Sequence, residues 1–69
     1  MEDKQEICNA LCKVLKMTLN QADMENLTYT KQRDLEYVTA RYTSGAEIII
    51  TVTWNSGIVM IRDILKRLS

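Results

Sequence analysis

Two cysteines, Cys8 and Cys12, have the types and spacing that could form a metal site, a redox pair or a nucleophile. On a helix, positions i and i+4 hold their Cβ vectors side by side, which is a poor geometry for a disulfide. A structural zinc site takes four ligands, and the sequence has no histidine or second cysteine pair to complete one. The cations near them in sequence are Lys4, Lys13 and Lys16, and no base is adjacent. We therefore interpret both cysteines as buried, reduced thiols that act as small apolar side chains.

The carboxylates and glycines give no catalytic pattern either. Asp34, Glu36 and Glu47 fall at strand positions, where ion pairs with Lys31 and Arg41 on neighbouring strands account for them. Paired acids that hydrolyse a glycoside work in a cleft, which a chain of this size has little room to form. Both glycines fall at predicted turns, and there is no glycine-rich phosphate loop. Because histidine, the commonest acid–base catalyst, is also absent, we expect no enzyme activity, no cofactor and no metal.

Length and charge narrow the class of protein. The 69 residues form one predicted domain, 1–69, and a domain of this size buries about 60% of the surface that its unfolded chain exposes. Nine basic residues balance nine acidic ones, so no net field draws the chain to nucleic acid or to an anionic membrane. The apolar runs are far shorter than the roughly 20 residues of a membrane helix, and the charged start MEDKQE is unlike a secretory signal. We expect a soluble, cytoplasmic protein without membrane contact.

The strongest strand signal lies in residues 46–57, which read AEIIITVTWNSG. The run is rich in β-branched residues and ends in a turn signal. Alternation along the strand predicts that every second side chain faces the core: Ile48, Ile50, Val52 and Trp54.

Two further strands precede this one. A three-residue turn ending at a left-handed Gly45 sets the strand Leu35–Tyr42 against it, with Arg41 opposite Glu47 on the outer face. A two-residue turn would shift the register and mix charges into the apolar face, so we prefer the first. A shorter strand, Leu27–Lys31, is predicted to complete the sheet.

A first helix is predicted before these strands. Asp3 and Glu6 fit a capping box, and apolar residues then recur from Ile7 to Leu19, with Asn20 suited to end the helix. The apolar arc is wider than the roughly 100° stripe that packing on one sheet requires. Either the second helix or another subunit must cover the excess, and we expect a homodimer because so short a chain has neither a disulfide nor a metal to stabilise it.

A second helix is predicted after the sheet, with Asn55 or Ser56 as its N-cap. Its apolar face recurs at helical spacing: Ile58, Ile61, Ile64, Leu65 and Leu68. Since Ile58–Ile61 is also a β-like run, a fourth short strand there is the alternative.

The predicted fold class is therefore α+β, in the order α-β-β-β-α, with a three-stranded antiparallel meander and both helices packed on one face. This element order and length are similar to those of double-stranded RNA-binding domains and of the small HicA-type ribonuclease toxins. The RNA-binding family carries lysines at the start of its last helix, where this chain has SGIVM in 56–60, and the toxin family relies on a histidine. The resemblance implies a shared topology, with neither activity carried over.

The remaining candidate sites are surfaces. The outward positions of the predicted strands include Tyr37, Arg41, Ile49 and Thr51, and Tyr and Arg are residue types that dominate protein–protein contacts. The alternative is nucleic-acid binding through cations of the two helices: Lys13, Lys16, Arg62, Lys66 and Arg67.

We expect a small non-enzymatic interaction module that binds a protein partner. Its profile is that of an accessory or inhibitory protein of a phage or mobile element, such as a blocker of a host defence nuclease.

Overall fold

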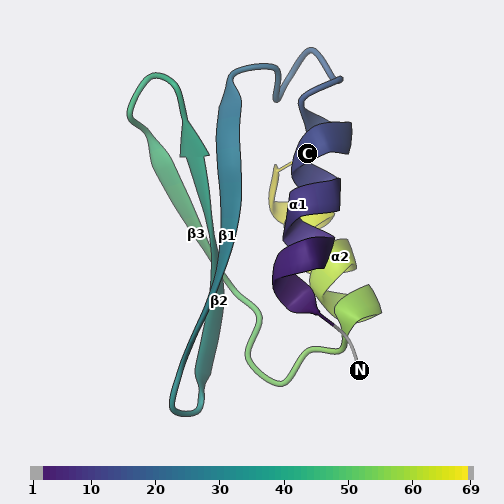
Figure 1. Cartoon of the computed structure of the whole chain (residues 1–69), viewed down its shortest axis with the longest axis vertical. Coiled ribbons are helices and arrows are strands. Elements are labelled where there is room, and N and C mark those ends of the chain that lie inside the picture. Colours follow the sequence, from purple (N-terminus) through teal and green to yellow (C-terminus); the bar gives the residue numbers. More distant parts are fainter. Residues whose placement is uncertain (1–2, 69) are drawn as a thin grey trace.

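The computed structural model describes residues 3–68 and contains the five predicted elements in the predicted order. They are α1 (Lys4–Leu15), β1 (Met24–Gln32), β2 (Leu35–Tyr42), β3 (Glu47–Thr51) and α2 (Gly57–Leu68). The strands form one antiparallel sheet in the order β1-β2-β3, and both helices lie on the same face of it (Figure 1). The predicted fold class is confirmed.

Helix α1 begins where the capping pattern predicts but ends earlier. Asp3 is its N-cap and accepts a hydrogen bond from the backbone N–H of Glu6 at 3.1 Å. The prediction that the helix continues to Leu19 is wrong, since the helix ends at Leu15. There the hydroxyl of Thr18 donates to the Leu15 carbonyl at 2.7 Å, and the Thr18 N–H also bonds to it, which closes the turn.

The turn between β2 and β3 has the predicted register. Gly45 adopts a φ of 93°, and the Tyr42 N–H donates to the Ala46 carbonyl at 3.0 Å. Arg41 therefore lies opposite Glu47, and the two side chains form an ion pair of 3.2 Å. The left-handed glycine sets which face of both strands is buried.

Strand β3 ends at Thr51, three residues before the prediction. Trp54, predicted to be buried, is 83% exposed and has a φ of 68°. The cause is a partner distant in sequence, because the Trp54 N–H donates to the carboxylate of Glu36 at 3.2 Å. This bond holds the backbone in a left-handed turn, so the alternation of the strand does not reach Trp54.

Helix α2 excludes the fourth strand, since residues 58–61 are helical. Ser56 is its cap, with its hydroxyl accepting from the Val59 N–H at 3.3 Å. Its buried face is rotated from the predicted one, because Met60 faces the core and Ile58 is 75% exposed. The buried residues of α2 are Gly57, Met60, Ile64 and Leu68.

The core lies between the sheet and the two helices. Its largest fully buried side chains come from both helices, from β1 and β2, and from the residue directly after β3: Met24, Leu27, Met60, Ile64, Val38, Val52 and Cys8. Part of the wide apolar arc of α1 packs against this core through half-buried Ile7 and Leu11, whereas Val14 is 58% exposed. The fold thus covers only part of the arc.

Candidate functional site

The outer face of the sheet is an open surface built from three rows of cross-strand neighbours. Each row takes one residue from each strand: Thr30, Tyr37 and Thr51; Thr28, Thr39 and Ile49; Asn26, Arg41 and Glu47. We call these nine residues the open face. Both helices lie on the opposite side of the sheet (Figure 1), so within residues 3–68 no helix covers it.

The four residues predicted to bind a partner all lie on the open face. Tyr37 is directly opposite Thr51, and Ile49 lies in the next row beside Thr39. Arg41 forms an exposed ion pair of 3.2 Å with Glu47. The pairing of β2 with β3 therefore gathers Tyr37, Arg41, Ile49 and Thr51 into one surface, although they come from two separate strands.

A shallow hollow of about 270 Å³ lies on this face beside the ion pair. Its lining combines polar side chains from all three strands: Asn26, Thr28, Thr39, Arg41 and Glu47. The hollow is slightly smaller than the roughly 300 to 1,000 Å³ of typical small-molecule sites. Its lining offers both hydrogen-bond donors and acceptors at the surface.

A buried carboxylate on the other face of the sheet was assigned wrongly from the sequence. Glu36 was expected to pair with Lys31 or Arg41, but it points inward and lies 2.7 Å from the ammonium of Lys4 on α1. The hydroxyl of Tyr29 donates to the same carboxylate oxygen at 2.6 Å. With the Trp54 N–H on the other oxygen, this carboxylate links α1, β1 and the β3–α2 connection.

These donors set the electrostatics of the cluster. The hydrogen bond from Lys4, followed by those from Tyr29 and from the Trp54 backbone, lowers the pKa of Glu36 to about 2. Burial and the hydrogen bond to Glu36 raise the pKa of Tyr29 to about 12. The cluster is a fixed ion pair whose charges compensate each other, with Lys4 also 5.6 Å from the centre of the Tyr29 ring.

The sequence held a signal for this cluster. Glu36 alternates in phase with Val38 and Ala40, which face the core, so period-two alternation already placed it inward. Tyr29 alternates in phase with buried Leu27, and Lys4 lies in the first turn of the first helix. An inward acid facing an inward tyrosine indicates a buried hydrogen bond.

Both cysteines are free, and the predicted burial is confirmed for Cys8 but wrong for Cys12. Cys8 is fully buried, and burial, with the neighbouring Cys12 as a smaller cause, raises its pKa to about 11. Cys12 is half-buried, and its sulfur lies 3.9 Å from the carbonyl oxygen of Glu25. The described residues include no group of three or more metal-ligating side chains of the histidine, cysteine or acidic types.

The five cations of the nucleic-acid alternative are all exposed. Lys13 and Lys16 lie on and directly after α1, and Arg62, Lys66 and Arg67 lie on α2. The guanidinium of Arg62 forms an exposed ion pair of 3.3 Å with neighbouring Asp63. The chain as a whole has zero net charge, so acidic groups offset this positive charge.

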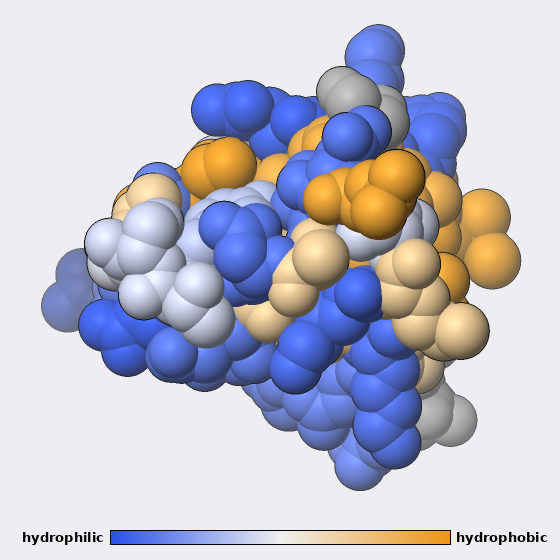
Figure 2. All heavy atoms as spheres, turned by 90° about the horizontal axis from the view of Figure 1, so that it is seen from above, coloured by the Kyte–Doolittle hydropathy of each residue, from blue (hydrophilic) through white to orange (hydrophobic). Residues whose placement is uncertain are grey.

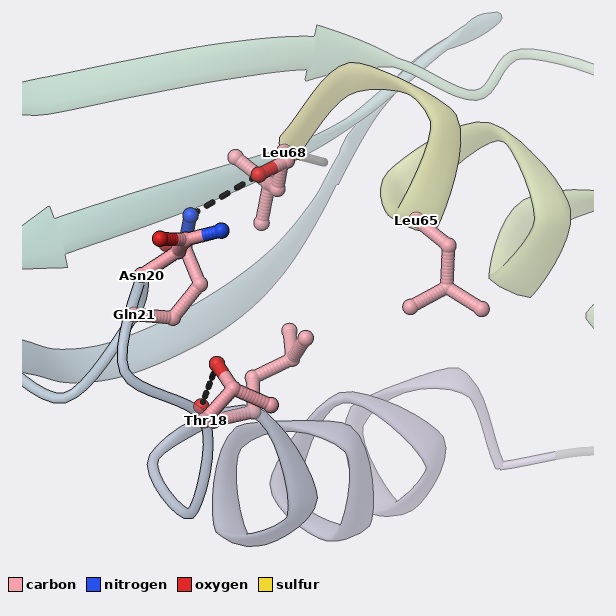
Figure 3. Close-up of a pocket in the computed structure, with 6 residues that line it drawn as sticks. Thr18, Asn20, Gln21, Leu65 and Leu68 are labelled. Atoms are coloured by element: carbon pink, nitrogen blue, oxygen red, sulfur yellow. Dashed lines mark hydrogen bonds between the residues drawn. The ribbon is translucent and has the colours of Figure 1, made fainter.

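A second hollow, of about 150 Å³, lies between the ends of the two helices. It is lined mainly by apolar atoms of Leu15, Leu65 and Leu68 together with Thr18, Asn20 and Gln21. Figure 3 shows Leu65 pointing from α2 toward α1, while the side chain of Gln21 donates to the Leu68 carbonyl at 2.8 Å. The Tyr42 hydroxyl in turn donates to Gln21 at 2.6 Å, so Gln21 caps α2 and joins it to the sheet.

The same end of the molecule exposes apolar side chains. Seen from above, hydrophobic residues lie at the surface among hydrophilic ones (Figure 2). Met17 and Leu19, on the connection between α1 and β1, are both largely exposed. They were predicted to belong to the helix, and the early helix end at Leu15 instead places them on a loop.

Comparisons with known proteins do not identify the chain. No family model, curated protein or solved structure matches it. In residues 3–68 no helix is long and apolar enough to cross a membrane.

Proposed function

We propose that the protein is a small, non-enzymatic, cytoplasmic interaction module that binds a protein partner through the open face. The observation that carries this proposal is the gathering of Tyr37, Arg41, Ile49 and Thr51 on one uncovered sheet surface. Tyrosine and arginine are enriched among the few residues that carry most of the binding free energy at protein interfaces. The proposal includes a homodimer and an accessory or inhibitory role for a phage or mobile element.

The geometry of the open face favours contact with a folded partner. The backbone of a paired sheet is already ordered, so docking on it costs little backbone conformational entropy. Arg41 forms an exposed ion pair with Glu47, and the hollow beside them accepts a polar side chain. An apolar contact at Ile49, which is 62% exposed, adds the hydrophobic component that such interfaces need.

The test is capture from a lysate of the native host, followed by affinity measurement with the purified partner. Replacing Tyr37 and Arg41 by alanine is expected to weaken binding by roughly thirtyfold or more, because an anchor residue contributes about 2 kcal/mol. The matched control replaces Lys13 and Lys16 by alanine, which changes two exposed side chains of the helical layer and leaves binding intact.

The nucleic-acid alternative predicts the reverse pattern. The Lys13 and Lys16 variant would lose binding, and affinity for a duplex would fall steeply between low and moderate salt as counterions are released. A gel-shift titration at both salt concentrations measures this. The proposal would be refuted by a salt-sensitive gel shift that is lost in the Lys13 and Lys16 variant. The same shift would have to persist in the Tyr37 and Arg41 variant.

A further inference from the structure

The sheet has two edges, and α1 protects one of them. The side-chain amide of Gln5 donates to the Leu27 carbonyl at 3.2 Å and accepts from the Tyr29 N–H at 2.9 Å. These are the backbone groups of β1 that an added strand would bond. Gln5 therefore occupies the β1 edge, which argues against strand addition there.

The edge of β3 is open. The Val52 N–H donates to the Glu36 carbonyl at 2.9 Å, and the Ala46 carbonyl accepts from the Tyr42 N–H at 3.0 Å. Even-numbered residues thus turn their backbone groups toward β2. Alternation along an antiparallel ladder turns the N–H and C=O groups of Glu47, Ile49 and Thr51 to the outer edge. Within residues 3–68, β2 is the only strand beside β3.

The sequence of β3 favours pairing. The strand reads EIIIT, with four β-branched residues and a charge only at its first position. Soluble proteins commonly blunt an edge of this kind with lysine, proline or a bulge, and β3 contains neither lysine nor proline. An open edge with high β propensity is a template for another strand.

We propose that β3 pairs antiparallel with β3 of a second copy, about a twofold axis that passes through Ile49. This register overlaps the full length of both strands. Glu47 lies opposite Thr51 of the second copy, Ile49 lies opposite its own equivalent, and each of these pairs exchanges two backbone hydrogen bonds.

Charge and hydropathy match across this axis. The acid at position 47 faces an uncharged threonine, so no like charges oppose each other. On the outer face the two exposed Ile49 side chains cover each other, and on the inner face Ile48 lies beside Ile50 of the second copy. Because β3 is complementary to itself on both of its faces, we infer that the strand bound at this edge is β3 of a second copy of this chain.

The pairing joins two three-stranded sheets into one continuous sheet. Both helical layers then lie on one side, and the two open faces form a single surface on the other. The proposed function includes a homodimer, and this inference rests on it by naming the β3 edge as the surface through which the two copies associate. The two contacts share Ile49 and Thr51, whereas Tyr37 and Arg41, the anchors of partner binding, lie on β2 and take no part in the pairing.

The test is the dimer dissociation constant of two variants that place opposite charges at one exposed position, measured by sedimentation without any partner. Thr51→Lys places a lysine opposite Glu47 of the second copy and is expected to tighten the dimer. Thr51→Glu opposes two acids and weakens it, so the two constants should lie roughly tenfold apart or more.

A second matched pair separates this contact from one through the helices. Ile49→Lys opposes two lysines on the axis and is expected to abolish the dimer, whereas Val14→Lys alters a similarly exposed side chain of α1 and should keep it. Circular dichroism confirms that each variant is folded. A wild type that is monomeric at about 100 μM would overturn the proposal. So would a dimer whose dissociation constant does not change with the charge at position 51 and that is lost in Val14→Lys. Because no partner is present, either result leaves partner binding to be decided by the Tyr37 and Arg41 variant.

Discussion

Glu36 holds its charge beneath the sheet because three donors from distant parts of the chain converge on its carboxylate. Lys4, Tyr29 and the backbone of Trp54 each contribute one hydrogen bond. A buried acid without such partners would be strongly destabilising. The cluster therefore ties the start of α1 to the sheet and fixes the path of the chain after β3.

The pKa of Glu36 predicts how stability depends on pH. Folding lowers this pKa from 4.5 to about 2, so the folded state favours the ionised form. The resulting stabilisation is fully present above pH 4.5 and is lost as the pH falls through about 2. In urea denaturation from pH 7 to pH 2, the free energy of unfolding of the wild type should fall mainly between pH 4.5 and about 2. The fall should be clearly shallower in Glu36→Gln.

Tyr29→Phe tests a second member of the same cluster through the free energy of unfolding. It removes one donor to the carboxylate and keeps the aromatic ring, so we expect a loss of about 1.5 to 3 kcal/mol at pH 7. If Glu36→Gln keeps the full pH dependence of the wild type, another carboxylate must cause it, and the role given to Glu36 is wrong.

At the scale of elements, two positive-φ turns flank β3 and differ in their residues. Gly45 precedes the strand with a φ of 93°, and Trp54 follows it with a φ of 68°. A side chain at Gly45 would meet no atom within 4 Å, so the cost of Gly45→Ala is a backbone cost alone, about 1 to 2 kcal/mol.

Trp54→Gly should behave differently at the second turn. Glycine relieves the left-handed strain, while its greater freedom in the unfolded chain offsets part of the gain, so stability should stay within about 1 kcal/mol of the wild type. Chemical denaturation of both variants checks the pair. A loss in Trp54→Gly as large as that in Gly45→Ala would mean that the exposed indole packs on the protein and contributes stability.

These two turns also show what the sequence could predict. The register of β2 and β3 depends on a short turn and on the Arg41–Glu47 pair, both local features, and it is confirmed. The position of Trp54 depends on Glu36, a partner 18 residues away, which no local alternation contains. The open face follows from the same register, so its four predicted residues come together, whereas their role in binding stays a prediction.

At the scale of the whole molecule, the folded chain leaves large apolar side chains exposed on both the sheet and the helices. A domain of this size buries only about 60% of the surface of its unfolded chain, and several large apolar side chains stay exposed, among them Ile49 and Val14. Stability supplied by a second copy would be linked to folding by mass action.

This linkage makes thermal stability depend on concentration. If folding and pairing through β3 occur together, each tenfold rise in protein concentration stabilises the dimer by about 1.4 kcal/mol, and Tm should rise by roughly 3 to 5 °C. At any one concentration Thr51→Lys should have a higher Tm than the wild type and Thr51→Glu a lower one, because pairing through β3 then contributes more or less to the stability of the folded dimer. Scanning calorimetry over a hundredfold range measures all three. A Tm that is independent of concentration in the wild type would mean that the single chain supplies all of the stability and that the open β3 edge remains unpaired.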